Sequence, residues 1–216
     1  MASSEKIIKI LQKRYREKIY KSDPFRTLVG VILSHQTNDK ISWPATDRLF
    51  SVAKNPEDFV KMGWKKIDSH IKNVNYHPTK AKRIYLICKM LIERFDGKVP
   101  RTREELMELP GVGPKSASIV LSFGFGVPTI AVDTHTYRVS KRLGLVPIKA
   151  TPEKAQKILE EIVAKKYHLI VNSLFIDFGR DICQAKRPQC FKCPVYSFCK
   201  YERKMYFKKL PRLTVL

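Results

Sequence analysis

Lys115 carries an amine that could do covalent chemistry in this chain. It follows the run Leu109-Pro110-Gly111-Val112-Gly113-Pro114, and a short helical pattern over residues 103–109 ends where that run begins. Proline fits the first turn of a helix, where its missing N–H is not needed. The stretch therefore predicts a helix–hairpin–helix with Lys115 on the first turn of the second helix. There the amine could act as a nucleophile or simply contact a phosphate.

The two glycines of this hairpin predict an anion-binding turn. We expect Gly111 and Gly113 to adopt backbone conformations that a side chain would forbid, and to let backbone N–H groups approach a phosphate closely. Farther along, Asp133 stands at the start of another helical pattern. Aspartate is a favoured helix N-cap, so a structural interpretation of Asp133 is available from its position alone.

Four cysteines near the end of the chain form a second chemical group. Their spacing is C-x6-C-x2-C-x5-C, at Cys183, Cys190, Cys193 and Cys199. Thiolates gathered in this way select a soft metal, either a structural Zn²⁺ or a [4Fe–4S] cluster. Zinc ribbons usually pair two C-x2-C knuckles, so the single knuckle here favours the cluster, and zinc stays open. The fifth cysteine, Cys88, lies on the apolar face of its helix and is expected in the core.

The charge of the chain points to a polyanionic partner. Its 216 residues contain 42 Lys and Arg against 20 Asp and Glu, which gives a net charge of +22. Nucleic acid is the simplest partner for such an excess, although a lysine-rich thermophile surface would look similar. Lys186 and Arg187 lie between the first two cysteines, where a metal-pinned loop could present them to phosphates. They could also belong to a solvated basic tail. Whether the last ten residues contact nucleic acid stays open.

Helical periodicity runs through nearly the whole chain, and strand signals are almost absent, so we expect an all-α fold. In residues 78–95, Ile84, Ile87, Leu91 and Ile92 share one face. The other predicted helices span residues 5–20, 25–34, 39–54, 64–72, 133–143, 152–166 and 169–180, and a short one follows Asn55-Pro56. Asp23-Pro24 and Asn55-Pro56 each indicate a helix N-cap followed by proline at the first helical position. We see no signal peptide and no apolar run long enough for a membrane span, so we expect an intracellular protein with reduced thiols.

Together, these motifs resemble the endonuclease III family of helix–hairpin–helix DNA glycosylases. The resemblance rests on residues 109–115, 132–135 and 183–199, with further matches at 33–36 and 76–81. It implies two helical lobes with a DNA cleft between them. One lobe would be a six-helix barrel over residues 17–127, and the other, from residues 1–16 and 128–216, would hold a [4Fe–4S] cluster.

The resemblance also implies a reaction, base excision repair of duplex DNA carrying a damaged base or an abasic site. The target base would be flipped out of the duplex, and Lys115 would attack C1′ of the deoxyribose. A Schiff base and β-elimination would follow, assisted by the Asp133 carboxylate. Gln36 would fill the gap left by the base, and Tyr76 would wedge into the opposite strand unless it is an ordinary loop tyrosine. The amides of Gly111, Val112 and Gly113 would bind phosphate.

Several residues depart from the family pattern. His35, Thr37 and Asn38 differ from the residues common around the glutamine, so the base pocket, placed near His35 and Gln36, is expected to be altered. Oxidised pyrimidines are the expected substrates. Two alternatives stay open, a glycosylase for T or U opposite G and a non-catalytic, zinc-stapled DNA-binding module. We expect a monomer without membrane contact, in the cytoplasm and nucleoid, or in the nucleus of a eukaryote.

Overall fold

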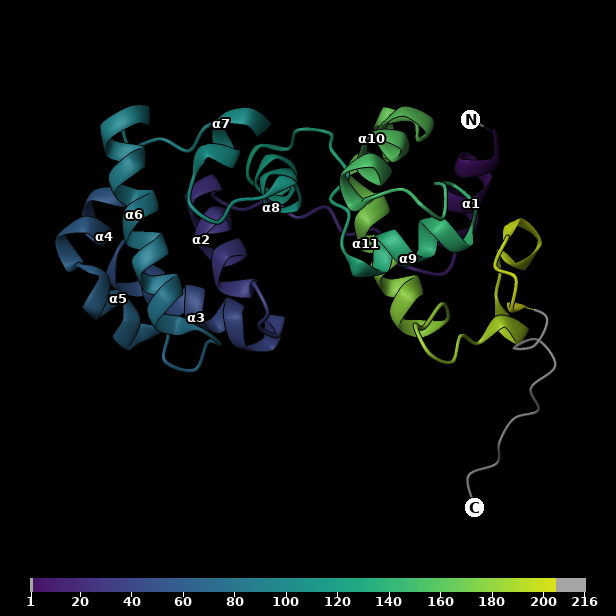
Figure 1. The fold of residues 1–216 in the computed structure, drawn as a ribbon, viewed down its shortest axis with the longest axis horizontal. Coiled ribbons are helices and arrows are strands. Elements are labelled where there is room, and N and C mark those ends of the chain that lie inside the picture. The colour runs from purple at the N-terminus through teal and green to yellow at the C-terminus, as the bar shows by residue number, and fades with distance from the viewer. Residues whose placement is uncertain (1, 205–216) are drawn as a thin grey trace, which may run out of the picture. The chain divides into compact units, whose positions relative to one another are not determined.

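The computed structural model describes residues 2–204, and the basic tail left undecided above lies outside them. The described residues contain helices and turns but no strand, which confirms the all-α prediction (Figure 1). They form two compact units, one from residues 20–127 and one from residues 2–19 together with 128–204. Each unit has its own apolar core.

The unit of residues 20–127 is a continuous stretch of chain. Its helices are α2 (Pro24–Ser34), α3 (Asp39–Val52), α4 (Pro56–Met62), α5 (Trp64–His70), α6 (His77–Phe95), α7 (Arg103–Glu108) and α8 (Pro114–Ile119), which continues as a π-helical turn over Val120–Gly124. The helix α6 packs on α4 and α5, and α2 packs on α3 (Figure 1). The core includes three mutually packed rings, Phe25, Phe50 and Phe59, with centroids 5.2–5.5 Å apart.

Polar caps fix where these helices begin. The Asp23 side chain accepts a hydrogen bond from the Arg26 amide at 2.8 Å, and Asn55 does the same for the Asp58 amide at 2.8 Å. A proline follows each cap at the first helical position. Such caps satisfy amides that the helix itself leaves unpaired.

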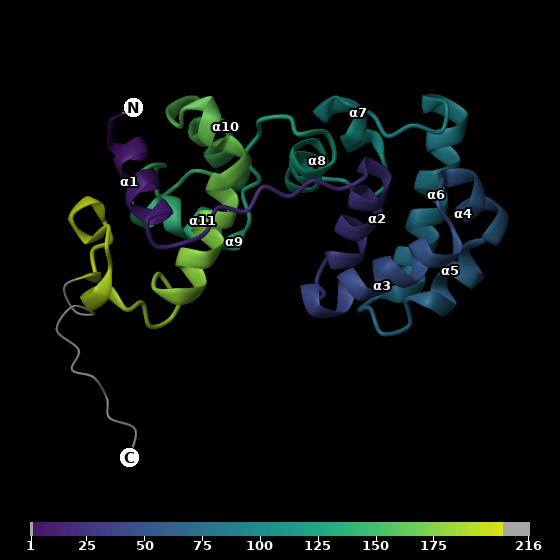
Figure 2. The ribbon, with the colours of Figure 1, turned by 180° about the vertical axis from the view of Figure 1, so that it is seen from behind.

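The second unit is built from both ends of the chain. Its helices are α1 (Ala2–Gln12), α9 (Thr134–Arg142), α10 (Pro152–Ile162) and α11 (His168–Asp181), with short 3₁₀ turns at Lys165–Tyr167, Cys190–Lys192 and Tyr196–Phe198. The helix α11 packs on both α9 and α1, as the view from behind also shows (Figure 2). Phe175 and Phe178 of α11 are buried in this core beside Ile7 and Leu11 of α1.

Two details of the predicted helices are wrong. The first helix ends at Gln12 rather than near residue 20, because the chain beyond it is bound to α11 instead. Arg14 and Tyr15 contact Asp181, and Lys18 pairs with Asp177 at 2.7 Å. Ile92, expected on the apolar face of α6, is 37% exposed.

No helix among residues 2–204 combines the length and apolar character needed to cross a membrane.

Candidate functional site

The predicted helix–hairpin–helix is present, formed by α7, a tight turn and α8. Val112 anchors the turn, because its side chain is only 5% exposed and its amide donates to the Leu109 carbonyl at 3.0 Å. The Val112 amide is therefore occupied within the hairpin, which corrects its expected role as a phosphate donor. The amides of Gly111 and Gly113 remain for that role.

The two hairpin glycines differ in what they require. Gly111 has φ +78°, and a Cβ there would lie 2.5 Å from the Arg83 side chain. Gly113 is in ordinary extended backbone, with φ −97° and ψ −179°, so the expectation of an unusual conformation is wrong for it. Apart from its chain neighbours, no described residue has an atom within 4 Å of where a Cβ at 113 would be. Nothing inside the protein thus demands glycine at 113, whereas close approach of a ligand backbone would.

This contrast gives a prediction for Gly113→Ala. Since the backbone is relaxed and the space empty, we expect the melting temperature to stay within about 2 °C of wild type. A methyl group on the hairpin should nevertheless hinder phosphate approach and weaken duplex DNA binding about tenfold, measured by fluorescence anisotropy. Gly111→Ala is the comparison, because strain at positive φ should lower its melting temperature as well. Unchanged affinity of Gly113→Ala would argue against a phosphate site here.

Lys115 lies on the first turn of α8, as predicted, and its side chain is exposed. The next residue, Ser116, is buried, and its hydroxyl lies 3.0 Å from Nε2 of His35. Burial lowers the pKa of His35, and the cations Lys80, Arg83 and Lys115 lower it further, so the imidazole is neutral near pH 7. The structure thus connects the predicted pocket residue His35 to the helix that carries Lys115.

Gln36 and Tyr76 are both exposed and both left-handed, with φ +52° and +58°. Residues other than glycine rarely hold this conformation, and where they do it often marks a functional site. The Asn75 side chain joins the two loops by donating to the Gln36 carbonyl at 2.7 Å. Tyr76 is 66% exposed, so its ring is available for stacking.

Sequence reasoning missed two residues of this region, Asn75 and Lys80. Lys80 is 3% exposed, and its ammonium donates to Leu33 O at 2.8 Å, to Thr37 Oγ1 at 2.9 Å and to His35 O. A signal was present, because Lys80 lies one helical turn before Ile84 on the apolar face of α6. A lysine in an apolar stripe points to a buried, hydrogen-bonded cation.

Asp133 belongs to the other unit, where it caps α9. Its Oδ1 accepts a hydrogen bond from the Thr136 amide at 2.7 Å, so the structural interpretation of this residue is confirmed. His135, on the first turn of α9, lies with Nδ1 3.1 Å from the Arg138 guanidinium. The helix begun by Asp133 reaches the predicted metal site at its other end.

Arg138 and Arg142 of α9 hold the loop between the first two cysteines. Arg138 Nε donates to Cys183 O at 3.0 Å, and Arg142 donates to the carbonyls of Gln184 at 2.7 Å and Ala185 at 2.9 Å. Arg142 also lies 3.5 Å from the Cys183 sulfur. The loop backbone is thereby fixed, while the side chains of Lys186 and Arg187 are exposed.

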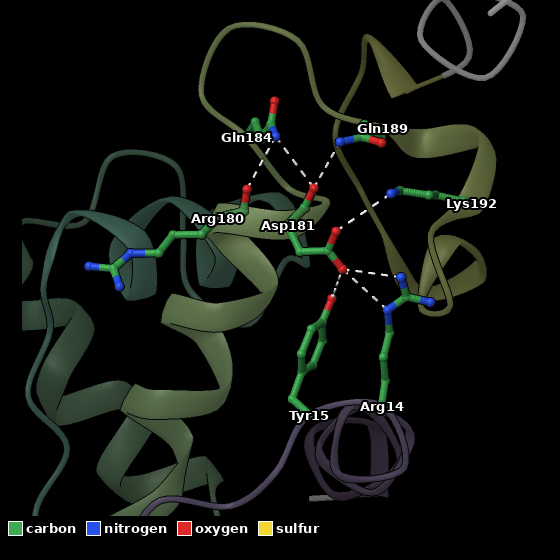
Figure 3. Close-up of polar contacts among 7 residues, drawn as sticks. All are labelled: Arg14, Tyr15, Arg180, Asp181, Gln184, Gln189 and Lys192. Atoms are coloured by element: carbon green, nitrogen blue, oxygen red, sulfur yellow. Dashed lines mark hydrogen bonds and ion pairs between the residues drawn. The ribbon is translucent and has the colours of Figure 1, made fainter.

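A network around Asp181 holds the same region from the other side (Figure 3). Its carboxylate accepts from Arg14 at 3.1 Å and Tyr15 at 2.8 Å, and Lys192 lies 3.5 Å away. Although burial would raise the pKa of Asp181, these hydrogen bonds lower it below its usual value. Gln189 donates to the Asp181 carbonyl at 2.9 Å. Asp181 thus joins three parts of the chain, which are the segment after α1, the end of α11 and the loop between Cys183 and Cys190.

The four predicted metal-binding cysteines line one hollow, together with apolar and aromatic side chains such as Phe178 and Tyr201. Burial raises the pKa of the Cys193 thiol to about 12, and it also raises the pKa of Cys190 and Cys199. Within residues 2–204, no three Cys, His, Asp or Glu side chains converge closely enough to hold a single metal ion. Four thiols around one hollow are a soft donor set, so these residues could hold a soft metal centre.

Cys88 behaves differently from these four. It is fully buried in the core of the other unit, and burial raises its thiol pKa. A protonated thiol among apolar side chains is unreactive, so the predicted core role is confirmed.

Comparison with known proteins agrees with this geometry. Residues 29–165 match the HhH-GPD superfamily of base excision DNA repair proteins. The fold and the hairpin therefore define a helix–hairpin–helix repair protein of that class. Endonuclease III of Bacillus subtilis is 42% identical over 183 residues, which cover 85% of this chain and 84% of the relative.

Two solved structures extend the comparison. A trapped covalent intermediate of endonuclease III with DNA, in an estranged-adenine complex, has a TM-score of 0.82 and 36% identity, covering 94% of this chain and 98% of the other. A thermostable thymine-DNA glycosylase has a TM-score of 0.80 and 25% identity, covering 94% and 97%. The chain belongs to the endonuclease III family of DNA N-glycosylases with AP lyase activity, which act in base excision repair.

Proposed function

We propose that this chain excises oxidised pyrimidines from duplex DNA by covalent catalysis at Lys115 and then cleaves the strand by β-elimination. The observation that carries the proposal is the exposed amine of Lys115, presented by a glycine hairpin on the first turn of α8. A structure 36% identical to this chain is that of a covalent endonuclease III–DNA intermediate, which supports covalent catalysis here.

The bond changes follow from an amine attacking a sugar. After the base is flipped out, Lys115 Nζ forms a bond to C1′, and the bond from C1′ to the base nitrogen breaks with its electron pair leaving on the base. Opening of the sugar ring gives an iminium. Loss of a proton from C2′ then expels the 3′ phosphate and cuts the strand. Asp133 would stabilise positive charge on the sugar and take a proton from the amine.

We assign Gln36 and Tyr76 to the DNA distortion that this reaction needs. An exposed amide could replace the hydrogen bonds of a flipped base, and an exposed aromatic ring could stack on the opposite strand. His35 would line the rim of the base pocket. The amides of Gly111 and Gly113, with Lys186 and Arg187 of the cysteine loop, would contact phosphates.

We propose a [4Fe–4S] cluster ligated by Cys183, Cys190, Cys193 and Cys199. The donor set is soft, the thiols surround a common hollow, and the Tyr201 amide lies 3.4 Å from the Cys199 sulfur. Amide and guanidinium hydrogen bonds to sulfur stabilise such ligands. When bound, the cluster would cross-link the cysteines and hold the basic loop in place.

A pair of cysteine variants tests this assignment. Cys199→Ala should lose the iron, the acid-labile sulfide and the visible absorption of the purified protein, and it should bind duplex DNA more weakly as the loop loosens. Cys88→Ala, the control, should keep all three signals and lose about 1–2 kcal/mol of stability through a small core cavity. Zinc in the wild-type protein, or full iron retention by Cys199→Ala, would contradict the cluster.

We further propose that the two compact units are the barrel and cluster domains expected from the sequence. The protein would act as a monomer on damaged or abasic duplex DNA at the nucleoid. Its excess of cations would favour DNA contact through phosphates.

The substrate assignment is tested with a panel of duplexes that carry thymine glycol, uracil, a T:G mismatch, 8-oxoguanine or an abasic site. We expect strand scission at thymine glycol and at the abasic site. The thymine-DNA glycosylase among the similar structures favours T:G repair as the second candidate function. Release of thymine from T:G without strand scission, and no activity on thymine glycol, would select that candidate instead.

A further inference from the structure

We propose that Lys80 is a positioning residue that holds Gln36 in the shape needed to enter the DNA base stack. The inference rests on the proposed function, because it assigns a task to the loop of residues 35–37 during base extrusion. It concerns a residue that does not touch DNA or the reacting atoms, and that acts through the backbone beside Gln36.

The Lys80 ammonium binds three oxygen atoms at once, and we call this arrangement the clamp. An ammonium has three N–H donors, and the acceptors here are Leu33 O, His35 O and Thr37 Oγ1. Leu33 lies in the last turn of α2 and His35 is its C-cap, where carbonyls lack helical partners and carry partial negative charge. One cation thus joins the end of α2 to both neighbours of Gln36.

The cation is buried without a carboxylate among its described partners. Its side chain is 3% exposed, and all three partners are neutral oxygen atoms. Burial, followed by repulsion from Arg83, lowers the pKa of Lys80 to about 8. Burial of an ammonium without a carboxylate partner costs desolvation free energy. This cost is explained if the ammonium fixes a conformation that the chain would not otherwise keep.

The fixed conformation is that of Gln36. Its φ of +52° is disfavoured for an L residue, and it lies between two residues held by Lys80. The Gln36 carbonyl is further held by Asn75, beside the left-handed Tyr76. His35 in turn contacts Ser116, next to Lys115. Lys80 therefore supports both the exposed loop and its link to α8.

The clamp and its alternative, a lysine that merely stabilises the core, predict different results. Lys80→Met removes the cation, and Thr37→Val removes one acceptor from a loop without changing α6. Thr37→Ser restores the hydroxyl, and Lys89→Met is a control at an exposed position of the same helix. Two measurements are made on each variant, amide hydrogen exchange and single-turnover kinetics.

If Lys80 acts as a clamp, Lys80→Met and Thr37→Val should raise the rate of amide hydrogen exchange at residues 35–37. The amides of α6 should stay protected. Base excision from a thymine glycol duplex should fall at least tenfold in Lys80→Met, about 1.4 kcal/mol in the barrier, and by less in Thr37→Val. Borohydride trapping on a preformed abasic site, which has no base to extrude, should change less than about threefold. Thr37→Ser and Lys89→Met should resemble wild type.

Equal losses on the damaged base and the abasic site, or exchange raised throughout the unit, would overturn the clamp and indicate general destabilisation. Unchanged exchange at residues 35–37 in both variants would overturn it directly. If wild-type protein excises no base at all, the proposed function fails, and the exchange measurement still decides whether Lys80 holds the loop.

Discussion

Replacing Lys115 by alanine is expected to abolish the covalent complex that borohydride traps between wild-type protein and a thymine glycol duplex. The amine supplies the bond to C1′, and no other group in the proposed mechanism can replace it. Removal of a nucleophile commonly costs several orders of magnitude, so we expect base excision to fall at least about 10³-fold. Gel separation of the trapped complex and single-turnover excision measure the two effects.

The side chain of Lys115 is exposed, so its removal should leave the fold intact and affect DNA affinity only by one cationic contact. Lys89→Ala, also exposed and in the same unit, controls for the loss of one positive charge. A trapped band of undiminished intensity from Lys115→Ala would show that another amine is the nucleophile. A Lys115→Ala protein with wild-type excision would reduce this residue to a phosphate contact.

Asp133→Asn is expected to lower the excision rate about 10²–10⁴-fold while DNA binding stays near wild type. The substitution separates the two roles of this residue. Asparagine caps a helix as well as aspartate does, so the hydrogen bond from the Thr136 amide is kept and α9 should not lose stability. Only the negative charge, which the proposed mechanism needs at the sugar, is removed.

Asp133→Ala completes the comparison, because it removes both charge and cap and should cost about 1 kcal/mol of stability in addition. Single-turnover rates, DNA affinity and thermal unfolding are measured on both variants. If Asp133→Asn keeps the wild-type rate, or if its rate and stability fall together, the carboxylate has only its structural role.

Local signals made much of the fold predictable. Asp23 and Asn55, each followed by proline, predicted the starts of α2 and α4, because a cap and a proline act on amides within one turn. The end of α1 was not predictable, since Arg14 and Tyr15 are bound by Asp181, 166 residues or more farther along the chain. Periodicity contains no information about partners so distant in sequence.

Some features of the candidate site were likewise predictable from local sequence, and others depend on contacts between distant residues. Lys115 on its helix turn and the cap at Asp133 follow from local spacing. The left-handed backbone of Gln36 and Tyr76 does not, because neither residue type favours positive φ and the contacts that hold it come from elsewhere. The occupied amide of Val112 and the relaxed backbone of Gly113 likewise depend on the geometry of the folded turn.

The division of the chain between the two units has a consequence for the order of folding. Residues 20–127 are contiguous, so all their contacts can form while the ribosome is still making the remainder. The other unit must wait, because α1 packs on α11 and Arg14 meets Asp181 only after 167 further residues have emerged. Closing so long a loop is entropically costly and slow. During synthesis, the first helix therefore leaves Ile7 and Leu11 without their final partners until α11 has emerged.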